Sequence, residues 1–170
     1  MKKSFLIGVV TTGLLILGVG AHRAGKNFRT AQDSLKTMPS LNLLLTDSST
    51  KINTKDMASN DPIVLIYFSP DCEHCQVQIQ EIIDHIQSLQ NVQFVLLTPI
   101  SLHDLKEFGD KLNISQYKNI TLAYDYCYLF YKYFKAKSFP YVAIYNGQKQ
   151  LVKLYKREIK IDRLIKAVSI

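Results

Sequence analysis

The chain has 170 residues, which is enough for one domain with an accessory segment but too few for two full domains. A hydrophobic content of 47% with 21% charged residues excludes a wholly disordered chain, and only three cysteines argue against a disulfide-stapled scaffold. The net charge of +7 is concentrated late in the chain without a nucleic-acid-binding motif, so we interpret it as a solvated face and expect no nucleic-acid partner.

The N-terminus predicts export across a membrane or anchoring in it. Two lysines precede a charge-free apolar run at residues 5–21, FLIGVVTTGLLILGVGA. As a helix this run would extend about 25 Å, just enough for a thin bilayer core. It fits a retained signal-anchor helix or a signal peptide cleaved after Ala21, and its length favours retention. We expect residues 1–22 to be this anchor or signal peptide, and residues 23–38 to be a linker.

The remaining residues alternate between strand-like and helix-like patterns. In chain order, the predicted elements are a strand at 41–45, a turn or loop region at 46–61 with one short turn around 54–58, a strand at 63–68, a helix that ends at Asn91, a strand at 92–97, a helix at 102–112, a strand at 120–124, a helix carrying 129–134, strands at 141–145 and 151–155, and a closing helix at 161–168. This order predicts an α/β domain at residues 39–170, with a mixed central sheet and helices on both faces.

Local signals set several ends of these elements. Ser101 followed by Asp104 approximates a capping box, and Asp125 can cap the helix that follows it. Asn146-Gly147 predicts a hairpin with a type I′ turn. Cys127 shares a helical stripe with phenylalanines, which favours a small buried hydrophobe over a third redox thiol.

The segment that carries chemistry is Cys72-Glu73-His74-Cys75, after a buried strand and at the start of a helix. Unpaired amides and the dipole at a helix N-terminus favour a thiolate at Cys72, which is the species that attacks a disulfide. Cys75 is one helical turn further, so the two sulfurs can close a reversible disulfide. A protonated His74 favours the thiolate whereas Glu73 opposes it, so the sequence does not fix the reduction potential.

The motif also allows other interpretations. A purely structural disulfide is one alternative, and metal handling through Cys72, His74 and Cys75 is another, although zinc needs about four ligands and no second cysteine pair exists. Covalent haem attachment fails, because it needs a histidine directly after the second cysteine, where this chain has Gln76. We expect no metal and no cofactor other than the disulfide itself.

The stretch IVLIYFSPDCEHCQ, together with Ser138-Phe139-Pro140 and the following YVAIYN, resembles the thioredoxin superfamily, and within it the membrane-tethered TlpA-like thiol–disulfide oxidoreductases. The resemblance implies a thioredoxin-like fold, with Cys72 as the exposed nucleophile and Cys75 as the buried resolving thiol. It further implies a cis peptide bond before Pro140, whose loop faces the dithiol and binds substrate together with Phe139. Two departures are Glu73-His74 between the cysteines and Ile66 where thioredoxins carry a buried aspartate.

The resemblance also implies a cellular setting. We expect a monomer in the bacterial cell envelope, anchored in the inner membrane with its domain facing the periplasm, or secreted there if cleaved. Its partners would be protein thiols and disulfides and a membrane or periplasmic electron donor, and reduction of exported proteins is the favoured direction. The alternative functions are a non-catalytic thioredoxin-fold binding module and a metal-handling protein.

Overall fold

The computed structural model describes residues 36–58 and 60–169. One compact unit spans Thr37–Ile170. The predicted anchor or signal peptide and nearly all of the predicted linker lie outside the described residues. No helix among the described residues is long and apolar enough to cross a membrane.

Seven strands form one mixed sheet in the described part of the chain, in the order β2-β1-β5-β4-β3-β6-β7. The strands are β1 (Asn42–Leu45), β2 (Lys51–Asn53), β3 (Ile63–Tyr67), β4 (Gln93–Thr98), β5 (Ile120–Tyr124), β6 (Tyr141–Tyr145) and β7 (Leu151–Tyr155). Strands β3, β4 and β5 pair in parallel, whereas every other pairing is antiparallel. The predicted mixed sheet is therefore confirmed.

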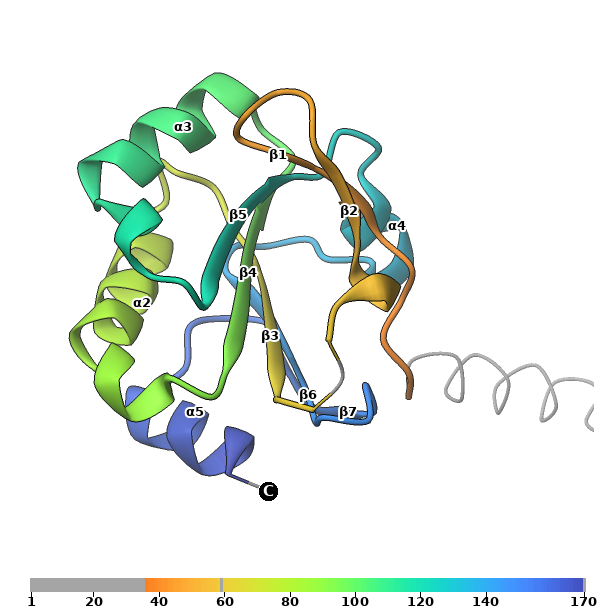
Figure 1. Cartoon of the computed structure of the whole chain (residues 1–170), viewed down its shortest axis with the longest axis vertical. Helices are drawn as coiled ribbons and strands as arrows, with labels where there is room; N and C mark the ends of the chain where they lie inside the picture. The colour runs from red at the N-terminus through yellow and green to blue at the C-terminus, as the bar shows by residue number, and fades with distance from the viewer. Residues whose placement is uncertain (1–35, 59, 170) are drawn as a thin grey trace, which may run out of the picture. The chain divides into compact units, whose positions relative to one another are not determined.

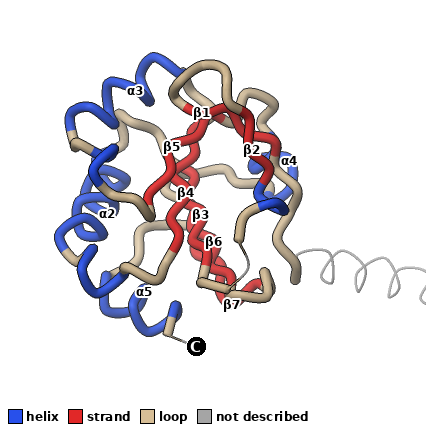
Figure 2. The backbone as a smooth tube through the Cα atoms, in the orientation of Figure 1, coloured by secondary structure: helices blue, strands red, loops and turns tan. Residues whose placement is uncertain are grey.

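Helices lie on both faces of this sheet, as predicted. Within the described ranges they are α2 (Glu73–Asp84), α3 (Leu102–Lys111), α4 (Leu129–Phe134) and α5 (Ile161–Val168), with short 3-10 turns η1 (Thr54–Asp56), η2 (Ile86–Leu89) and η3 (Ile114–Gln116). The connections β3–α2–β4 and β4–α3–β5 step in the same direction across the sheet, so right-handed crossovers place α2 and α3 on one face. Figures 1 and 2 show α2, α3 and α5 on one side of the sheet and α4 on the other.

Strand β3 contributes to the apolar packing on both faces, which explains its continuous apolar sequence. All of its residues are buried. Ile66 belongs to the cluster that contains Cys75 and Ile79 of α2. Successive residues of a strand point to opposite faces, and Tyr67 accordingly stacks on Phe130 of α4, with ring centroids 4.7 Å apart. The dithiol helix and α4 therefore cover opposite faces of the same strand.

The turn or loop region predicted at residues 46–61 contains η1 where a short turn was expected, but the prediction missed a strand. Residues Lys51–Asn53 form β2, which pairs antiparallel with β1 at the edge of the sheet, with Leu43 opposite Ile52. The turn before it is held by Asp47, whose Oδ1 accepts hydrogen bonds from the amides of Ser49 and Thr50. An edge strand this short needs no apolar alternation, so the sequence pattern did not indicate it.

The helix that was predicted to end at Asn91 stops earlier than expected. Helix α2 stops at Asp84, His85 leaves helical geometry, and Ile86–Leu89 continues as the 3-10 turn η2. Leu89 is nevertheless buried, so the apolar stripe continues toward the core after the α-helix has ended. Periodicity alone could not separate these two helical geometries.

The hairpin between β6 and β7 forms as predicted, but its turn is not the predicted type I′ turn. No glycine among the described residues has a positive φ, and Lys149 adopts the left-handed conformation with φ 59° instead. Asn146 fixes the loop: its backbone carbonyl accepts from the amide of Lys149, and its Oδ1 accepts from the amides of Gln148 and Gln150. The hairpin thus has a three-residue loop.

Both predicted helix caps are confirmed. Ser101 Oγ accepts hydrogen bonds from the amides of His103 and Asp104, and Asp125 accepts from the amides of Leu129 and Phe130.

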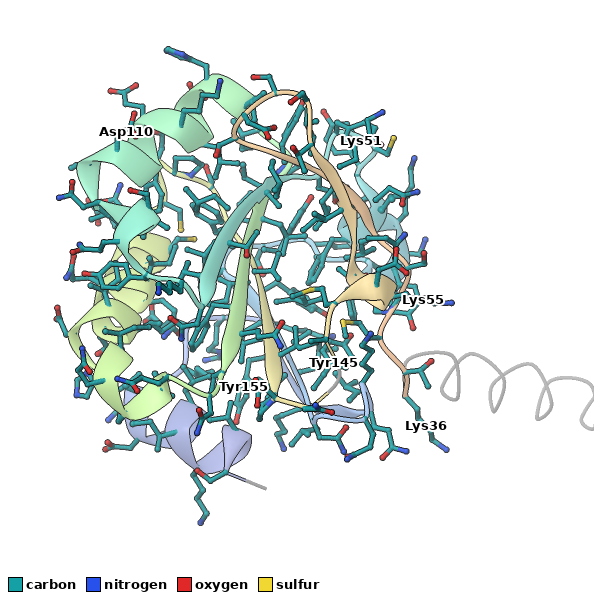
Figure 3. The ribbon with its side chains drawn as sticks, viewed as in Figure 1. Lys36, Lys51, Lys55, Asp110, Tyr145 and Tyr155 are labelled. Carbon is teal, nitrogen blue, oxygen red and sulfur yellow. The ribbon has the colours of Figure 1, made fainter. Side chains whose placement is uncertain are left out.

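Among the side chains labelled in Figure 3, those of Lys51, Lys55 and Asp110 are exposed, whereas Tyr145 lies within the fold. In the described ranges, Asp125 is the one charged side chain that is buried.

Candidate active site

The predicted dithiol lies at the carboxyl end of β3, where the chain turns into α2. Phe68 continues the pairing of the sheet, because its amide donates to the carbonyl of Leu97. The turn that follows is closed by the amide of Cys72, which donates to Ser69, and by Gln76 Nε2, which donates to the carbonyl of Pro70 at 2.7 Å. These bonds hold the first turn of α2 against the end of the sheet.

The two cysteines differ sharply in exposure. Cys72 is the N-cap residue of α2 and is half-buried, whereas Cys75 is 0% exposed. Both thiols are free. Burial, followed by a hydrogen bond with the Cys72 thiol, raises the pKa of Cys75 well above its ordinary value. One accessible thiol therefore lies beside one that is buried and protonated, the arrangement expected of an attacking and a resolving pair.

The loop before β6 faces this pair. Strands β3 and β6 are antiparallel neighbours with Tyr67 opposite Tyr141, so the residues after Tyr67 and those before Tyr141 meet at one edge of the sheet. The Phe139–Pro140 peptide bond is cis, as the resemblance implied. The carbonyl oxygen of Phe139 lies 3.9 Å from Cys72 Sγ, and the Phe139 ring packs on Tyr67 with centroids 5.1 Å apart.

The two residues between the cysteines point into solvent. Glu73 and His74 are exposed, and the His74 Nδ1 atom lies 2.6 Å from Glu158 Oε2. Glu158 precedes α5, and sequence reasoning missed it, because no local pattern connects it to the dithiol. The charge of Glu158 also contributes to the raised pKa of Cys75.

Ile66 occupies the position at which thioredoxins carry a buried aspartate. Ile66 is fully buried in the same apolar cluster as Cys75. The one buried carboxylate among the described residues is Asp125, whose pKa is raised by burial and moderated by its two helix-capping hydrogen bonds. Asp125 caps α4, on the other face of the sheet, and so does not take the role that Ile66 cannot fill.

Cys127 departs from the prediction. It lies in the turn before α4 instead of within the helix, and it is half-buried, so it is not the fully buried hydrophobe that the stripe indicated. The left-handed backbone of Tyr128, with φ 54°, delays the start of α4 to Leu129. In the described part of the chain, no three His, Cys, Asp or Glu side chains are arranged to hold a metal ion.

Comparisons with known proteins agree with this geometry at the level of the fold. No protein-family model matches the sequence, and no curated protein matches it. The structure is similar to a secreted Mycobacterium tuberculosis disulfide oxidoreductase homologous to E. coli DsbE, with TM-score 0.64 and 15% identity, covering 76% of this chain and 95% of that one. It is also similar to MTB dsbF, with TM-score 0.61 and 20% identity, covering 78% and 98%.

The chain has a thioredoxin-like fold. A peroxiredoxin-like protein from Aquifex aeolicus is similar as well, with TM-score 0.65 and 15% identity, covering 79% of this chain and 84% of that one. Because disulfide oxidoreductases and a peroxiredoxin-like protein share this fold, the structural similarity does not indicate which reaction the chain catalyses. The choice rests on the residues around Cys72 and Cys75.

Proposed function

We propose that the protein is a thiol–disulfide oxidoreductase that reduces exported protein substrates through Cys72 and Cys75. The observation that carries the proposal is the pairing of a half-buried Cys72 at the start of α2 with a fully buried Cys75, facing the carbonyl of Phe139. Cys72 attacks a substrate disulfide and forms a mixed disulfide. Cys75 then attacks Cys72 Sγ and releases the substrate as a dithiol.

The loop at Phe139 supplies the contact for an extended substrate. Its backbone lies beside Cys72, so a peptide bound there would present its cysteine to the attacking sulfur. Within this proposal the apolar segment at residues 5–21 tethers the domain to the inner membrane on the periplasmic side, and a membrane or periplasmic thiol donor reduces the Cys72–Cys75 disulfide after each turnover.

The test is reduction of insulin disulfides by the full-length protein with a thiol donor. Wild type should be active, Cys72→Ser inactive, and Cys75→Ala should accumulate a mixed disulfide with the substrate. Cys127→Ser is the matched control, because it removes a thiol outside the dithiol pair, and it should retain activity. If both Cys72→Ser and Cys75→Ala kept the activity of wild type, the proposal would be rejected. Substrate capture by the doubly substituted protein, without any exchange by wild type, would indicate a binding module.

A further inference from the structure

The loop between β7 and α5 is attached to the first turns of the dithiol helix at two points. The amide of Ile159 donates to Gln78 Oε1 at 2.6 Å, and Glu158 Oε2 pairs with His74 Nδ1 at 2.6 Å. Gln78 is only 1% exposed and Ile159 only 5% exposed. Positions 74 and 78 are one helical turn apart, and Cys75 lies between them in the sequence. The loop therefore brings a carboxylate to the part of α2 that contains the resolving thiol.

Resolution of a mixed disulfide requires Cys75 to lose its proton, since the thiolate is the nucleophile. Cys75 is buried in an apolar cluster that offers no base: Ile66 lies in that cluster, and the buried Asp125 caps α4 on the opposite face. Glu158 is a carboxylate whose charge reaches Cys75. Among the described residues, Glu158 is the acidic side chain that pairs with the first turn of α2 from outside that helix.

We propose that Glu158, held in place by His74, takes up the proton of Cys75 during resolution. This inference rests on the proposed function and names a proton-accepting residue for it. As the bond between Cys75 Sγ and Cys72 Sγ forms, the bond between Cys72 and the substrate sulfur breaks. The substrate sulfur leaves with the electron pair and takes a proton from solvent, while the Cys75 proton passes to the His74–Glu158 pair. The substrate disulfide is reduced by two electrons and the dithiol is oxidised.

The exposure of the pair suits this role. The side chain of Glu158 is 46% exposed and that of His74 is 74% exposed, so a proton accepted from the buried thiol can be released to water. An ion pair this exposed adds little to the stability of the fold. The other charged groups on these two segments are all exposed: Asp71, Glu73, Lys156, Arg157 and Lys160.

The test follows resolution of the mixed disulfide in full-length protein by acid quenching and mass spectrometry. Glu158→Gln should slow resolution by at least about tenfold and accumulate the mixed disulfide, because an amide cannot accept the proton. Glu158→Asp should recover most of the rate. The deficit of Glu158→Gln should shrink from about pH 7 to about pH 9, as hydroxide replaces the carboxylate in removing the proton. Glu107→Gln, which makes the same change on the exposed face of α3, should match wild type.

The outcomes separate this inference from the proposed function. If wild type shows no mixed disulfide and no exchange, the proposed function fails. If wild type exchanges disulfides but Glu158→Gln resolves them as fast as Glu107→Gln, only the role of Glu158 is overturned. A deficit that is constant with pH, or that Glu158→Asp does not relieve, would also overturn it, because it would mean that the substitution only disturbs the loop.

Discussion

The buried amide of Gln78 makes a quantitative prediction about how the loop beside the dithiol is held. Gln78→Ala removes the acceptor for the Ile159 amide at a position that is 1% exposed. A buried amide left without a partner costs about 1–3 kcal/mol. Loss of one buried methylene group adds about 0.8 kcal/mol. Removal of Gln78 Nε2, which is buried without a hydrogen-bond partner among the described residues, offsets about 1 kcal/mol. We expect a net destabilisation of about 1–3 kcal/mol.

Urea unfolding of the full-length protein measures this loss, and amide exchange at Ile159 reports whether the loop has opened locally. Gln80→Ala is the matched control on the same helix. Gln80 is exposed, and its amide donates to Asp84 one turn later at 2.8 Å, so its loss should change stability by no more than about 0.5 kcal/mol. Equal unfolding midpoints for the two variants, with the Ile159 amide still protected from exchange in Gln78→Ala, would refute the reasoning.

Three further predictions follow from single residues. Burial raises the pKa of Asp125 above 3.8, so the folded state binds the Asp125 proton more tightly than the unfolded state does. Protonation of Asp125 therefore favours the folded state at low pH, and this stabilisation is lost as pH rises from about 3.8 through the folded pKa. Urea unfolding should therefore show wild type gaining stability relative to Asp125→Asn as pH is lowered through that range, and a constant difference would contradict the prediction. Lys135 follows α4 with φ 53°, so Lys135→Gly should raise stability by about 0.5–1 kcal/mol in thermal unfolding, and a lower stability would count against it. In folded Cys72→Ser protein, iodoacetamide should modify Cys127 before Cys75, whose pKa is raised by burial; mass mapping that found Cys75 modified first would contradict the geometry.

The features that the sequence predicted correctly depend on local patterns. The apolar run of β3 indicated a strand buried on both faces, and Ser101 and Asp125 indicated helix starts because a cap acts within a few residues. The dithiol could be placed for the same reason, since a buried strand directly precedes Cys72.

The features that the sequence did not predict depend on tertiary contacts. Strand β2 pairs with the free edge of β1, and α2 is followed by a 3-10 turn while its apolar stripe continues. Glu158 reaches His74 because the loop after β7 is attached to Gln78, and no spacing in the sequence encodes that contact. The absence of an acid at Ile66 was visible in the sequence, whereas the contact between Glu158 and His74 was visible only in the fold.

The reduction potential of the Cys72–Cys75 pair tests the central claim most directly. Full-length protein, with Cys127→Ser alongside to isolate the pair, would be equilibrated in glutathione buffers and its thiols counted by mass spectrometry after alkylation. We expect a reversible two-electron couple between about −120 and −270 mV, the range of dithiol enzymes, and toward the negative end that suits a reductase. A pair that forms no disulfide, or one that stays oxidised below about −300 mV as structural disulfides do, would contradict it.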